Sequence, residues 1–179
     1  MRRGLLLLFA LALAAAAQDV GVRARAAARE LGEQIRSLLA AELAAGGFTG
    51  AVGVCAEKAQ AETRRYAAER GIRIRRVSLK ARNAQNRPDE WERARLAEWE
   101  ETLRQGRPLP EAAEGAAPDG AYRLMLPIRV QALCLTCHGD ARQIPAEVKA
   151  ILAKLYPEDA ATGYRNGDLR GAFSVVIPR

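Results

Sequence analysis

The spacing of apolar residues predicts two helices in the first half of the chain. Between residues 22 and 45, apolar positions recur every three or four residues among charged ones, which is typical of an amphipathic helix. Gly46 and Gly47 are expected to end this helix. A second helix is predicted over residues 49–70, and Gly71 is expected to stop it.

The second half of the chain alternates strands and helices. Residues 72–79 have the two-residue alternation of a half-buried strand, and residues 121–130 form a second strand in which Pro127 favours an edge or a bulge. A helix opens at Pro88 and Asp89, a short helix covers 145–155, and a last strand covers 172–177. Residues 106–120 are rich in proline and glycine and are predicted to be loop.

These elements predict an α+β fold with an antiparallel sheet flanked by helices and a long N-terminal helix. A parallel sheet is not expected, because strands and helices do not follow the regular βαβ order. No internal repeat is present, and the length suits one domain. We therefore expect a single domain over residues 18–179.

The first 17 residues have the layout of a secretory signal peptide. Arg2 and Arg3 precede an apolar run that ends in small residues at Ala17. The run is shorter than the roughly 20 residues that span a bilayer, so we predict cleavage rather than a retained anchor. The protein is then periplasmic or otherwise exported, without a stable membrane span. Loss of Arg2 and Arg3 takes the net charge from +7 to +5, which favours acidic proteins or anionic head groups as partners rather than nucleic acid in that compartment.

The stretch CLTCHGD, residues 134–140, matches the Cys-x-x-Cys-His signature of haem c attachment. In this interpretation Cys134 and Cys137 form thioether links to haem, and His138 binds the iron. Two of the three cysteines and the only histidine of the chain fall in this stretch, so a chance match is a weak explanation. The sequence therefore predicts one covalent haem c.

Two other chemistries use the same residue types. A redox-active Cys-x-x-Cys of the thioredoxin type is expected in a βαβ setting, which this chain lacks. A closed zinc site needs four ligands, and only Cys55 is available to complete Cys134, Cys137 and His138.

The ligand on the other face of the iron cannot be a second histidine of the chain. The residues leave Met125, Cys55, a lysine, a water molecule or an open position. Met125 lies in the apolar stretch LMLPI, which also suits core packing. Cys55 is a lone thiol, which equally suits burial as a small apolar residue.

Several motifs together resemble a small family of c-type haem domains with a PAS-like fold, which occur as exported proteins and as sensor modules. The matching stretches are VCAEKA, RRVSLKARNAQNRPDEWE, CLTCHGD and YPEDAATGYRNGDLRGAFSVVIP. The similarity covers residues 47–179, the expected PAS-like core. Ala84 is a departure, since proline often stands there in the family. The resemblance implies His/Cys axial ligation, by His138 and Cys55.

Other residues are weaker candidates for the same site. Within the basic segment 70–87, Lys80 and Arg82 are candidate partners of the haem propionates, although a solvated strand face explains the charges equally well. The stretch TGYRNGDLRG contains the turn dipeptide Asn166-Gly167, so its residues are predicted to be structural.

These features predict a redox or gas sensor in which ligand exchange at the iron is the signal to a separate redox or signalling protein. The alternative is an electron-transfer cytochrome that docks a protein partner. An enzyme is not expected, because the sole histidine is already used and no distal acid or base can be named. The helix over residues 22–45 suits either homodimer contacts or packing within the monomer.

Overall fold

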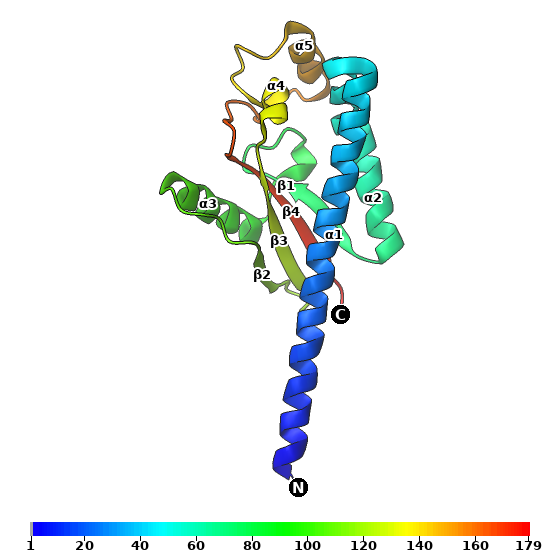
Figure 1. The fold of residues 1–179 in the computed structure, drawn as a ribbon, viewed down its shortest axis with the longest axis vertical. Helices are drawn as coiled ribbons and strands as arrows, with labels where there is room; N and C mark the ends of the chain where they lie inside the picture. The colour runs from blue at the N-terminus through cyan, green and yellow to red at the C-terminus, as the bar shows by residue number, and fades with distance from the viewer. Residues whose placement is uncertain (1) are drawn as a thin grey trace.

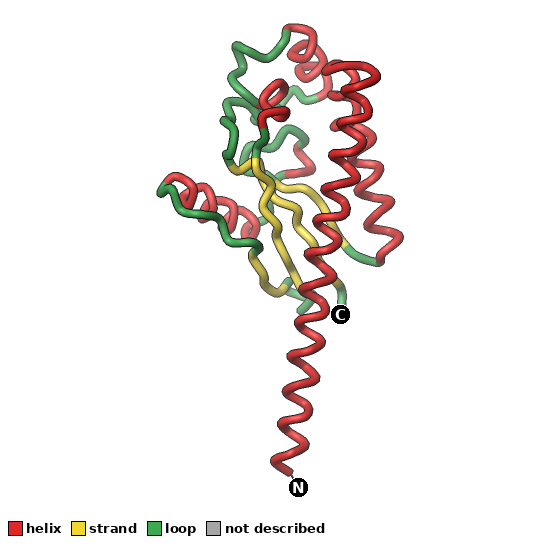
Figure 2. Tube along the Cα trace, in the orientation of Figure 1, coloured by secondary structure: helices red, strands yellow, loops and turns green. Residues whose placement is uncertain are grey.

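The computed structural model describes the chain from Arg2 to Arg179, and the side chains from Val20 onward except those of Cys55 and Ala56. The predicted signal segment therefore has no described side chains. Figures 1 and 2 show helices around one sheet, which confirms the α+β class. The elements are α1 (Arg2–Gly53), η1 (Val54–Lys58), α2 (Ala59–Arg70), β1 (Arg73–Val77), η2 (Ala84–Asn86), α3 (Glu90–Arg104), β2 (Ala113–Ala116), β3 (Tyr122–Arg129), η3 (Ala132–Cys134), α4 (Leu135–His138), α5 (Ala146–Leu155) and β4 (Leu169–Ile177).

The four strands form one antiparallel sheet in the order β1-β4-β3-β2. The last strand in sequence, β4, therefore lies between β1 and β3. It begins at Leu169, three residues before the predicted start. The side chains of β4 alternate between the two faces of the sheet. Because both faces are covered, nearly every position in β4 is buried.

The sequence predicts that residues 106–120 are loop, and this prediction is wrong in part. The strand β2 lies within the segment and pairs with β3. Its sequence, AEGA, has no large apolar residue that could signal a strand. Gly115 explains this composition: a Cβ there would lie 3.0 Å from the ring of Trp91. The strand thus remains small so that an aromatic side chain of α3 can lie against it.

Pro127 is accommodated without disturbing the sheet. β3 lies inside the sheet, but its pairing with β2 ends at Met125. Beyond that point β3 pairs with β4 alone, so Pro127 faces no strand on its other side. A register shift follows between Ile128 and Arg129, as the prediction of an edge or bulge requires.

The first helix breaks at Gly47, which has φ 63° and ψ −158°. This is a left-handed backbone value that glycine adopts at little cost. The chain reverses direction there, and α2 descends beside α1 in Figure 1. The predicted end of the first helix at Gly46 and Gly47 is confirmed. Gly71, also left-handed at φ 60°, caps the second helix as predicted.

One face of the sheet packs against α1. The helix contributes small residues and one leucine, which pack on alternate residues of β4: the contacts join Ala24, Ala27, Ala28 and Leu31 to Phe173, Val175 and Ile177. The apolar face of the N-terminal helix is thus used within the monomer. This arrangement favours the core-packing interpretation of that helix.

The opposite face of the sheet packs against α3. Its buried cluster contains Val77, Leu96, Trp99, Met125, Leu169 and Ala172. The helix begins with a capping box, in which Asp89 accepts from the Glu92 amide and Glu92 accepts from the Asp89 amide. Arg123 of β3 binds both carboxylates, which ties the start of α3 to the sheet.

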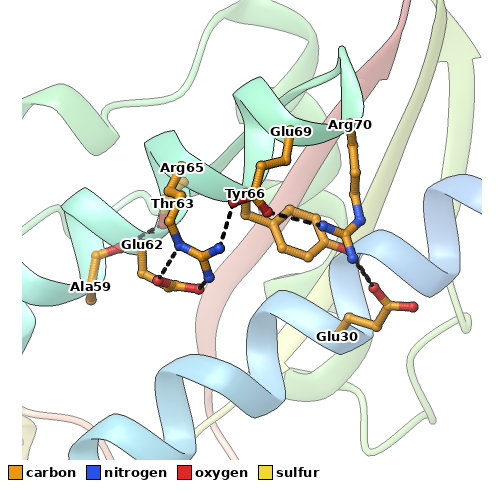
Figure 3. A network of polar contacts seen from close by, with 8 residues as sticks. All are labelled: Glu30, Ala59, Glu62, Thr63, Arg65, Tyr66, Glu69 and Arg70. Carbon is orange, nitrogen blue, oxygen red and sulfur yellow. Dashed lines mark hydrogen bonds and ion pairs between the residues drawn. The ribbon is translucent and has the colours of Figure 1, made fainter.

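A polar network holds α2 against α1 (Figure 3). The hydroxyl of Tyr66 donates to Glu30 at 2.7 Å, and Arg70 donates to the same carboxylate at 3.0 Å. Burial and this carboxylate together raise the pKa of Tyr66 to about 12. The Tyr66 hydrogen bond is the main cause that lowers the pKa of Glu30. The network fixes the helical hairpin in which η1 lies.

No helix among the described residues is long and apolar enough to cross a membrane. The search does not include the predicted signal segment, whose side chains are not described.

Replacing Leu31 by alanine should test the packing of α1 on the sheet. Leu31 is fully buried, so Leu31→Ala should lower the free energy of unfolding by about 2–5 kcal/mol. Val22 lies on the same helix but is 63% exposed, and Val22→Ala should change it by at most about 0.5 kcal/mol. Urea unfolding followed by circular dichroism measures both. Equal effects would contradict this packing.

Candidate functional site

The Cys-x-x-Cys-His motif forms one short helical turn between the sheet and α5. Cys134 ends η3, and Cys137 and His138 lie in α4. Both cysteines are free thiols and partly buried. The amide of Gln131 donates to the Cys134 sulfur at 3.4 Å. The two sulfurs and the imidazole therefore come from one compact segment, as attachment to a single macrocycle requires.

His138 has a fixed orientation. Its Nδ1 lies 2.7 Å from the carbonyl oxygen of Ala161, so Nδ1–H is the donor and Nε2 is left to bind a ligand. Burial is the main cause that lowers the pKa of His138 to about 2, and the charges of Arg170 and Arg82 add to it. The imidazole is thus neutral, which is the form that coordinates metal ions.

The backbone of the motif is clamped by the loop that precedes β4. The amide of Gly163 donates to the carbonyl of Gly139 at 2.7 Å, and that of Tyr164 donates to the carbonyl of His138 at 3.0 Å. A Cβ on Gly139 would lie 2.6 Å from the carbonyl oxygen of Leu135. Only glycine therefore fits directly after His138.

A buried ion pair connects this loop to the motif. Arg82 is 8% exposed, and its Nε donates to Asp159 at 2.9 Å. Its Nη2 donates to the carbonyl of Cys137 at 2.5 Å. The other oxygen of Asp159 accepts from the amide of Ala161 at 2.8 Å. Three segments far apart in sequence are thus held by one guanidinium and one carboxylate.

A second cationic group lies beside the aromatic ring of Tyr164. That ring meets the His138 ring edge-on, with 6.2 Å between centroids. Lys80 Nζ lies 5.0 Å and Arg170 Cζ lies 5.4 Å from the Tyr164 centroid. Burial lowers the pKa of Arg170, and the charges of Arg82 and Arg76 lower it further. Positive charge is therefore concentrated on this side of His138.

The segment that carries Cys55 lies next to the motif. Val52, at the end of α1, shares an apolar cluster with Ile144, Val148 and Leu152, against which Cys137 packs. Cys55 follows in η1, a single π-helical turn, a feature that is frequent at functional sites. The side chain of Cys55 lies outside the described residues, so its role as ligand stays a prediction.

Met125 lies in a different part of the molecule. Its side chain is fully buried with Leu96 and Trp99 in the α3 cluster. Neither cysteine of the motif packs in that cluster. Cys137 packs against the cluster beside α5, and Cys134 packs against the cluster that contains Tyr164. Core packing accounts for Met125.

The motif lacks the geometry of a closed metal centre. Within the part of the chain whose side chains are described, no three His, Cys, Asp or Glu side chains converge on a common point suited to an ion. Cys134, Cys137 and His138 are thus not arranged as zinc ligands. Attachment of a haem along its edge does not require the three side chains to converge on one point.

Sequence reasoning selected Lys80 and Arg82 and missed Arg170. The structure brings all three near His138, but Arg82 is occupied by Asp159 and by backbone carbonyls. Arg170 lies in the stretch predicted to be a structural turn, and only its charge could have drawn attention to it. The contribution of Ala161 is a backbone carbonyl, which no residue type signals.

The fold and the motif define a small α+β domain with a candidate attachment site for a prosthetic group. The model of the Tll0287-like family matches residues 11–178, and the chain belongs to this family. A similar solved structure is described as "Crystal structure of the cyanobacterial heme-protein Tll0287", with 31% sequence identity and a TM-score of 0.59. The match covers 70% of this chain and 72% of that chain. No curated protein matches.

Asp159→Asn should show that the motif depends on the buried ion pair. The variant leaves Arg82 without a carboxylate and should lower the free energy of unfolding by about 3 kcal/mol. The adjacent Glu158 forms an exposed pair with Arg87, 69% and 63% exposed. Glu158→Gln should therefore cost less than about 1 kcal/mol. Denaturant titrations of the two variants compare the effects, and a similar loss in both would refute a special role for Asp159.

Proposed function

We propose that the protein is an exported monohaem c-type cytochrome. In this proposal Cys134 and Cys137 hold haem c by thioether links, and His138 is an axial ligand of the iron. The observation that carries it is the hydrogen bond from His138 Nδ1–H to Ala161, which leaves a neutral Nε2 to coordinate iron. The similarity to a structure described as a heme-protein supports it.

We assign Cys55 as the second axial ligand. Support comes from Val52, which precedes Cys55 by less than one helical turn and packs in the cluster that contacts Cys137. The π-helical turn of η1 is further support, and the packing of Met125 in the core argues against Met125 as the ligand. A thiolate donates electron density to ferric iron and lowers the reduction potential relative to methionine.

The proposed activity is redox sensing, with response to a gas as a variant of the same mechanism. Protonation or release of Cys55 after reduction would free the π-helical turn η1 from the motif. That change is the signal passed to a redox or signalling protein in the periplasm or another exported location. No catalytic step is assigned, since the only histidine of the chain serves as a ligand.

Cys55→Ser should remove the thiolate ligand without loss of haem. The full chain matured with haem should lose its low-spin thiolate signature in electron paramagnetic resonance spectra, while the pyridine haemochrome assay still shows covalent haem. Met125→Leu is the matched control, because it conserves core volume and should cost less than about 1.5 kcal/mol. A spectrum that changes in Met125→Leu and not in Cys55→Ser would reverse the assignment.

Electron transfer is the second candidate function, and one observation favours it. Leu133 directly precedes the motif and is 50% exposed, so an apolar side chain is available where a partner would approach the haem edge.

Spectra recorded at controlled potential separate the two functions. A sensor should change its axial ligand between ferric and ferrous states, because reduction weakens the bond to the thiolate. A carrier should keep both ligands and exchange electrons rapidly and reversibly. We expect a ligand change that Cys55→Ser abolishes, and identical ligation in both states would favour the carrier.

A further inference from the structure

Two cationic side chains near His138, Lys80 and Arg170, have no anionic partner among the described side chains. We call these two residues the cation pair. Lys80 donates to the carbonyl of Thr162 at 3.4 Å, and its Nζ lies 5.0 Å from the Tyr164 centroid. Arg170 Nη1 contacts the Ser78 hydroxyl at 2.9 Å and the Lys80 carbonyl at 3.3 Å. Among the described side chains, neither forms an ion pair. Arg82, by contrast, is neutralised by Asp159.

The position of Arg170 is set by the backbone rather than by a mobile loop. It is followed by Gly171, which has φ 152°, and a Cβ there would lie 2.1 Å from the carbonyl oxygen of Val77. Only glycine allows β4 to approach the end of β1 so closely. This approach brings the Arg170 backbone carbonyl within 2.8 Å of the Ser78 hydroxyl. The guanidinium, held by the Ser78 hydroxyl, lies 5.4 Å from the Tyr164 centroid.

Unpaired positive charge beside a buried imidazole is unfavourable unless an anion balances it. The charges of Arg170, Arg82 and Arg76 all act on His138. Asp159 is a carboxylate whose charge acts on Arg170, and it already binds Arg82. A carboxylate brought by a ligand of His138 would balance the remaining charge.

We propose that Arg170, together with Lys80, binds a propionate carboxylate of the haem attached at Cys134 and Cys137. The inference rests on the proposed function, which supplies that carboxylate, and it gives Arg82 a structural role instead. Arg170 is then a positioning residue that also keeps positive charge close to the iron. It favours the ferrous state and thereby opposes the effect of the thiolate.

The test compares Arg170→Gln and Arg170→Lys with the control Arg165→Gln in the full chain matured with haem. Arg165 is exposed and lies on the loop that precedes β4, so the control removes an equal charge that solvent screens. The readouts are covalent haem by mass and haemochrome assay, and the reduction potential over about pH 5 to 8, where a carboxylate without its cation begins to titrate.

At fixed ambient potential, Arg170→Gln should lower the ratio of ferrous to ferric protein at least about tenfold, or ~59 mV for this one-electron couple. It should also add a pH dependence beyond that of the wild type in this range. Arg170→Lys should recover at least half of the shift, and Arg165→Gln should change the ratio less than about threefold.

A haem-loaded Arg170→Gln protein with the potential and pH profile of the wild type would overturn the inference alone. A wild-type protein matured without covalent haem would instead overturn the proposed function.

Discussion

The hydrogen bond from His138 to the carbonyl of Ala161 is the interaction on which the rest of the site depends. It selects the tautomer and directs Nε2 away from the loop. The residue that carries this carbonyl is itself held in place: the amide of Ala161 donates to Asp159, and Asp159 binds Arg82. Because the pair is largely buried, it resists screening by salt, and loss of one partner would leave an uncompensated charge.

The same ion pair also explains how distant parts of the chain reach one site. Arg82 follows the first strand, the motif follows the third, and Asp159 precedes the fourth. The central position of β4 makes this meeting unavoidable, since its start must return to the end of the sheet where β1 and β3 finish. The helical hairpin turns at Gly47, and this turn brings Val52, just before η1, into the cluster against which Cys137 packs.

Most of the fold could be predicted because its signals are local. Gly47 and Gly71 end helices by their backbone freedom, and the alternation of apolar residues marks the strands. The short strand β2 could not be found, because its side chains are small where Trp91 needs room. The π-helical turn of η1 has no known sequence signal. Tertiary packing determines both features.

The site could be predicted only where a residue type has chemistry of its own. The motif named Cys134, Cys137 and His138, and the charges of the basic segment selected Lys80 and Arg82 as candidates. A structural arginine can be distinguished from a ligand-binding one only when the groups that it contacts are known. Arg82 finds a carboxylate 77 positions away, whereas Arg170 finds only neutral oxygens, and no linear pattern records this difference.

The proposed iron environment combines two opposite electrostatic influences that come from different elements. The thiolate of Cys55, on the helical hairpin, would favour ferric iron, whereas the cation pair beside Tyr164, on the sheet side, would favour ferrous iron. Release of the thiolate removes one influence and leaves the other, because Arg170 is anchored to Ser78 and Gly171 rather than to the hairpin. Reduction and release of Cys55 would therefore reinforce each other, which gives a sensor of this type a sharper response than either change alone.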